Sequence, residues 1–208
     1  MSNPATHKNH SFAEVIESSL GFFKAQSWEW DYFPAFGSLV TVRAGATTVF
    51  GIVYAVQTGS FDAGRYPFTY QKTEAELQAE QPQIFEFLQT TFTCLTIGFL
   101  EHNRIVYQVA PQPPKMHAFV SHATLPEITQ FFSSSAYLHI LFNAPHINPI
   151  DELLLALLRT QAEQGLLTKE LFFEFTQTMT LITGDDYRRL KIFMSRAQLL
   201  TETFKAFS

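Results

Sequence analysis

The sequence predicts an α+β protein: a small N-terminal antiparallel β-barrel followed by a C-terminal α-helical bundle. Residues 36–56 contain two runs rich in Val, Thr and Ile around a glycine-containing connection at 44–46, which is typical of two strands joined by a turn. Gly51 lies inside the second run, where the strand of a small barrel would bend sharply. After residue 124 the apolar residues recur at threes and fours, the spacing of amphipathic helices.

The barrel is expected to occupy residues 11–123, behind a polar leader at 1–10. Residues 74–90 interrupt it with four Glu and no basic residue, and Pro82 predicts a turn followed by a short helix over 82–89. The strands are expected around 14–18, 22–28, 37–43, 47–56, 91–100, 104–109 and 117–122.

The helical region is expected to occupy residues 124–208. A short helix is expected after Thr124, and residues 136–144 fit either a strand or a helix. The sequence does not decide whether residues 125–143 pack against the barrel or against the helices. Three longer helices follow. Their expected caps and stops are Asn148 and Pro149, Gly165, Thr168, Gly184 and Asp185.

Composition limits the classes of function. The chain has 208 residues, enough for one domain or two modest ones, and its net charge of −5 argues against bulk attraction to nucleic acid or anionic membranes. Its one cysteine, Cys94, excludes an intramolecular disulfide. No apolar run approaches the ~20 residues of a membrane-spanning helix. These observations predict a cytoplasmic protein.

The barrel segment resembles the HAS barrel found at the N-terminus of HerA-type DNA-translocating ATPases and of ATP synthase catalytic-ring subunits. The resemblance is carried by GSLVTV at 37–42 and VFGIVYAV at 49–56, and covers at most residues 11–122. In that family the barrel serves ring assembly and partner contact. The resemblance therefore implies an interaction role and no catalytic residue.

The chain departs from that family in lacking its ATPase signature. It contains no G-x-x-x-x-G-K-[ST] motif, and its glycines after the barrel, Gly165 and Gly184, fall at predicted helix ends. Because no P-loop is present to hold phosphates, ATP hydrolysis does not carry over. The resemblance fits a stand-alone barrel without its motor domain.

The sequence gives little evidence for a metal site or for a catalytic nucleophile. His117 and His122 lie five apart on a predicted strand and would point to opposite faces. No H-x-x-x-H or C-x-x-C spacing occurs, so we expect no metal and no cofactor. Cys94 could meet one of these histidines across a sheet, but its apolar run favours a buried, inert thiol. We expect a protein that is not an enzyme.

A dense aromatic run just before the first barrel hairpin is the candidate partner surface. Large aromatic side chains supply most of the binding energy at interfaces when they are exposed. Trp28 and Trp30, two apart, are expected to share a strand face, and core packing is the alternative role for at least half of the run. Its members are Trp28, Trp30, Tyr32, Phe33 and Phe36.

Two alternative functions stay open. A small ligand or nucleotide could bind between barrel and helices, near Lys24, Arg43, Glu101 or His117. An accessory role in weak nucleic-acid binding would use the basic cluster Arg188, Arg189 and Lys191. Residues 185–208 hold five basic and three acidic residues, a net of only +2.

Overall fold

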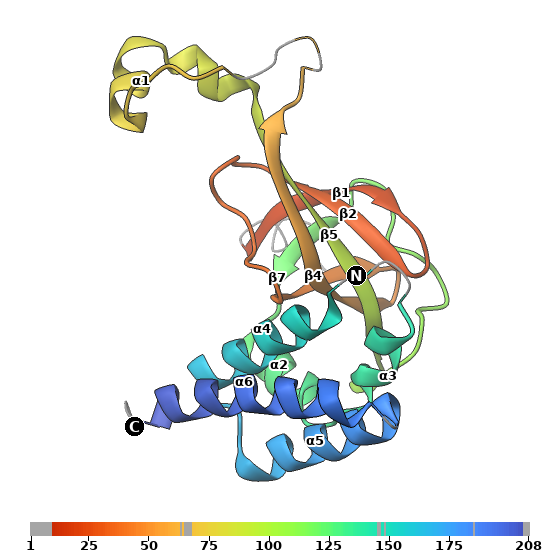
Figure 1. The fold of residues 1–208 in the computed structure, drawn as a ribbon. Helices are drawn as coiled ribbons and strands as arrows, with labels where there is room; N and C mark the ends of the chain where they lie inside the picture. Colours follow the sequence, from red (N-terminus) through yellow and green to blue (C-terminus); the bar gives the residue numbers. More distant parts are fainter. Residues whose placement is uncertain are drawn as a thin grey trace.

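The structure, a computed structural model, describes residues 10–62, 64, 68–144, 147, 149–184 and 186–205. Six antiparallel strands close into a barrel in the order β1-β2-β5-β4-β3-β7, because β2 pairs with both β1 and β5 (Figure 1). The strand β6 (Arg104–Val106) lies beside β5 outside this ring. The barrel strands are β1 (Ser11–Ser18), β2 (Phe22–Ser27), β3 (Leu39–Ala44), β4 (Thr47–Ser60), β5 (Leu88–Glu101) and β7 (Phe119–His122).

One hydrophobic cluster belongs to the barrel strands alone. Side chains alternate along a strand, so every second residue of β3 points to the same side, as Val40 and Val42 do. A Cβ added to Gly51 would lie 2.7 Å from a ring carbon of Phe23 and 2.9 Å from Cβ of Cys94. The register of β4 against β5 shifts between Phe50 and Gly51, so the irregularity expected at this glycine is present.

Five helices follow the barrel within the described residues. The segment 136–144, for which the sequence allowed a strand or a helix, contains the helix α3. Thr168 caps α5 as expected, because its hydroxyl accepts a hydrogen bond from Leu171 N at 3.2 Å. The expected caps Asn148 and Asp185 lie outside the described residues. The five are α2 (Leu125–Phe131), α3 (Tyr137–Phe142), α4 (Ile150–Glu163), α5 (Lys169–Thr183) and α6 (Tyr187–Lys205).

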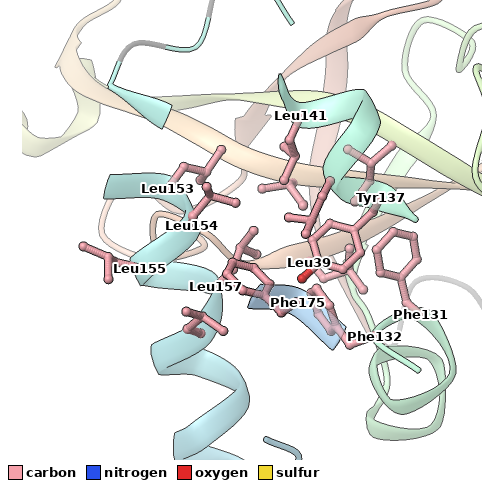
Figure 2. Packing of buried hydrophobic residues seen from close by; sticks show 14 of the residues in the cluster. Leu39, Phe131, Phe132, Tyr137, Leu141, Leu153, Leu154, Leu155, Leu157 and Phe175 are labelled. Carbon is pink, nitrogen blue, oxygen red and sulfur yellow. The ribbon is translucent and has the colours of Figure 1, made fainter. Parts of the chain in front are cut away.

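A second hydrophobic cluster joins the barrel to these helices (Figure 2). Phe50 from β4 meets the ring of Phe131 in α2 at 5.1 Å, and Phe131 lies 5.7 Å from Tyr137 in α3. Segment 125–143 therefore packs with both the barrel and the helices. The central contributors are Leu39, Ile52, Ile97, Leu138, Leu141, Leu153, Leu154, Leu157, Phe175 and Phe193.

The β4–β5 hairpin projects from the barrel as an arm, defined here as residues 57–91 (Figure 1). Its tip carries the helix α1 (Glu74–Glu80), and the 3₁₀ helix η2 (Pro82–Phe87) leads from α1 back into β5. The expected turn before Pro82 is wrong, because Thr73 and Glu76 form a capping box that starts α1 there. Pro82 then opens η2, and neither helix has a buried residue.

Candidate functional site

The aromatic run forms a loop, residues 28–36, which connects β2 to β3 and is called the aromatic loop below. Four of its side chains are exposed: Trp28 by 45%, Tyr32 by 52%, Phe33 by 42% and Phe36 by 41%. The fifth, Trp30, is half-buried. The loop therefore presents several large apolar side chains to solvent.

Trp28 and Trp30 do not share a strand face, so that expectation is wrong. The strand β2 ends at Ser27, and the chain then turns, with Tyr32 N donating to Glu29 O at 3.3 Å. Trp28 Nε1 donates to Glu14 Oε1 at 3.2 Å, and its ring meets Phe119 edge-on. These contacts hold Trp28 against the outside of the barrel.

The other end of the loop reaches the barrel mouth and the helices. Tyr32 packs edge-on against Phe12 at 5.8 Å and against His122 at 6.1 Å. Burial of the His122 ring lowers its pKa, so the neutral imidazole is the form that stacks on Phe12 at neutral pH. Phe36 lines a groove of about 470 Å³ against α4 and α6.

Trp30 joins the aromatic loop to the base of the arm. Its ring stacks on Phe85 of η2 with centroids 5.6 Å apart, and Thr90 donates a hydrogen bond to its carbonyl oxygen. Aromatic stacking of this kind adds about 0.5–1.5 kcal/mol beyond burial alone. The loop and the arm base are therefore one continuous surface, which the sequence alone does not show.

The arm tip has its own surface character. Phe61 and Phe68 are exposed by more than half, and Glu74, Glu76 and Glu80 are exposed on α1. The bond that Thr73 donates to the Glu76 carboxylate lowers the pKa of that group, so it stays ionised at neutral pH. The tip combines apolar rings with fixed negative charge.

The ligand residues expected near a junction pocket are not brought together. Lys24 lies opposite Glu17 and Thr93 in the sheet, and Glu101 pairs in register with Arg104. His117 Nδ1 lies 3.3 Å from Glu14 Oε2 on the outside of the barrel. Arg43 differs from these three, because it lines a hollow between the barrel and α2.

The basic cluster on α6 is divided by an ion pair. Arg189 binds both carboxylate oxygens of Asp151, with its shortest N–O distance at 2.7 Å, and this bond raises the pKa of the guanidinium. Arg188 and Lys191, on the same helix, form no ion pair with a described residue. The charge available for phosphates is therefore smaller than the sequence implied.

Cys94 lies in the barrel interior and is fully buried. Burial raises the pKa of its thiol, which keeps it protonated at neutral pH. His117 is mostly exposed, and Cys94 registers with Phe23 and Val53. Cys94 and His117 therefore do not form a thiolate–imidazole pair. Across the described ranges, no three His, Cys, Asp or Glu side chains cluster in a way that would hold a metal ion.

Comparison with known proteins adds no family. No protein-family model matches this chain, and none of the curated proteins matches it. Within the part of the chain that the structure describes, none of the helices has both the length and the apolar content needed to cross a bilayer.

Proposed function

We propose that this chain is a non-catalytic cytoplasmic interaction protein, whose HAS-like barrel and helical bundle carry a contact surface made by the aromatic loop. Self-association is the first expectation, and docking on a larger complex is the second. The exposure of Trp28, Tyr32, Phe33 and Phe36 supports the proposal most directly. Exposed large aromatics are the residue type that dominates binding energy at protein interfaces.

The arm supports the same proposal independently. A two-stranded hairpin is marginally stable alone, and within 61–87 no described side chain is buried. The segment therefore gains little from its own chain to offset the entropy of ordering. Such a segment is typical of a contact element that becomes ordered against a partner.

Light scattering across a wide concentration range tests the proposal. We expect a mass above the 23.7 kDa of one chain at high concentration. The double substitution Tyr32→Ser/Phe33→Ser should return the protein to a monomer, because it removes two exposed rings without emptying the core. The matched control is Phe173→Ser/Leu181→Ser, which removes two exposed apolar side chains from α5 and should leave the mass unchanged.

Docking on a larger complex has a separate readout. Wild type and both double variants, immobilised at equal density, are exposed to extract from the source cell and the retained proteins are compared. A protein retained by wild type and the α5 control, but lost from the loop variant, supports docking. Monomeric behaviour together with identical retention by all three chains overturns the proposal.

A further inference from the structure

A polar cleft of about 380 Å³ lies outside the barrel, where β1, β3, β4 and β7 meet the start of α2. Its volume falls within the range of roughly 300–1,000 Å³ that is usual for small-molecule sites. None of the exposed rings of the aromatic loop lines the cleft itself, although Trp28 contacts Phe119 and Tyr32 contacts His122, two of the lining residues. Its central lining residues are Ser11, Thr41, Arg43, Thr48, Phe119 and Ser121.

The strand register explains why these polar groups meet. Thr41 and Arg43 are two apart on β3 and therefore point to the same face. Ser121 on β7 lies directly opposite Thr41, and Thr48 on β4 lies directly opposite Arg43. Directly opposite residues have Cβ atoms about 5 Å apart, so Thr48 is the direct neighbour of Arg43, and Thr41 and Ser121 form the next pair on the same face.

Two of these groups have no partner among the described residues. Thr41 is only 8% exposed, yet its hydroxyl makes no hydrogen bond there, and the residue lines the cleft. Arg43 makes no ion pair with a described side chain. Among the described residues only the hydroxyls of Ser27 and Thr96 are both fully buried and without a partner, so the Thr41 hydroxyl keeps contact with the cleft and is able to donate to a ligand there.

None of the remaining titratable groups that line the cleft forms an ion pair with Arg43. Glu127 turns back to cap α2, where Oε2 accepts from Thr124 N at 2.7 Å and from Thr124 Oγ1 at 2.8 Å. The lowered pKa of His122 makes its imidazole neutral at pH 7. His10 is the last titratable group in the lining. Arg43 therefore supplies the fixed positive charge.

We propose that this cleft binds the oxyanion group, phosphate or carboxylate, of a small molecule. A guanidinium binds two oxygens of such a group at once, through parallel charge-assisted hydrogen bonds. The hydroxyls of Thr41 and Thr48 donate to the oxygens of the bound group, while the Ser121 hydroxyl is already hydrogen-bonded to that of Ser11 at 2.9 Å. The Phe119 ring offers an apolar wall for the rest of the ligand.

The test is a titration followed by two-dimensional amide NMR, with inorganic phosphate and citrate as probes and chloride at matched ionic strength as the control. Both probes should shift the amides of Thr41, Arg43 and Ser121 in a saturable way, and chloride should not. Saturation by one probe alone also supports the cleft and identifies the oxyanion as phosphate or as carboxylate.

Two substitutions make the result specific. Arg43→Gln should weaken binding roughly tenfold or more, while Arg104→Gln, an exposed arginine on β6, should leave it unchanged. Thr41→Val keeps the shape of the buried side chain and should weaken binding several-fold. Absence of saturable shifts in wild type, or equal shifts in the Arg43→Gln protein, would overturn the proposal.

Discussion

At the scale of single residues, Gly51 shows how the barrel interior constrains the sequence. A methyl group there would meet Phe23 and Cys94 closer than real Cβ atoms approach their neighbours. Gly51→Ala should therefore lower the free energy of unfolding by about 1–3 kcal/mol, the usual cost of overpacking a well-packed core. Urea denaturation followed by circular dichroism measures the change.

Gly59 is the matched control for this substitution. It lies on the same strand, in the arm, and a Cβ there would meet no atom within 4 Å. Gly59→Ala should leave the free energy of unfolding unchanged within about 0.5 kcal/mol. Equal losses at both positions would mean that the penalty comes from the strand backbone and that the interior contact with Phe23 plays no part.

Cys94 provides a second prediction at this scale. Because burial raises the pKa of its thiol and excludes solvent, a thiol reagent should not modify the native protein at neutral pH. Addition of denaturant should expose the thiol, and the loss of protection should follow the unfolding transition. The reagent is one that releases a coloured product when it reacts with a thiol. Because the chain has one cysteine, the absorbance of that product reports on Cys94 alone. Fast modification in native buffer would place Cys94 outside the core.

At the scale of elements, we expect the arm to contribute little to the free energy of unfolding. Replacing residues 61–87 by an Asn-Gly turn should change the free energy of unfolding by less than about 1 kcal/mol, because no described side chain there is buried. The contact of Trp30 with Phe85 is the main interaction lost. A loss of several kcal/mol, measured by the same denaturation assay, would show that the arm belongs to the folding core.

The elements differ in how far the sequence predicts them. Thr168 and the spacing of leucines in α4 specify local structure, so the C-terminal helices are predictable from neighbouring residues. The start of α1 is also encoded locally, by the capping box of Thr73 and Glu76, although proline at 82 obscures it. The arm cannot be predicted in this way. The strands β4 and β5 keep the residue pattern of a strand beyond the barrel, so the sequence does not show where the barrel ends and the arm begins.

The candidate sites depend on contacts that are distant in the sequence. The exposed aromatic residues could be named from composition, and four of the five are exposed. The contact between Trp30 and Phe85 joins positions that local pattern does not relate. The cleft needs the register of Thr41 against Ser121, which only the closed barrel fixes. Arg43 is the one cleft residue that the sequence indicates as a ligand contact, while His122 and Thr124 are singled out there for other reasons.

At the scale of the whole molecule, the helices and the barrel share a core. Phe50 and Ile52 from β4 lie in the same hydrophobic cluster as Leu153 and Leu157 from α4. This cluster leaves the aromatic loop and the arm outside it, so both surfaces are available without unfolding. Contact surfaces positioned by a rigid core are the usual arrangement in interaction proteins.

The central claim is that the aromatic loop mediates association, and light scattering during a dilution series tests it most directly. We predict a concentration-dependent oligomer whose dissociation constant rises at least tenfold in Tyr32→Ser/Phe33→Ser, since each hot-spot ring contributes more than about 1 kcal/mol. The Phe173→Ser/Leu181→Ser protein should behave as wild type. An oligomer that is equally stable in all three proteins, or a wild-type chain that is monomeric at every concentration, would contradict association through this loop.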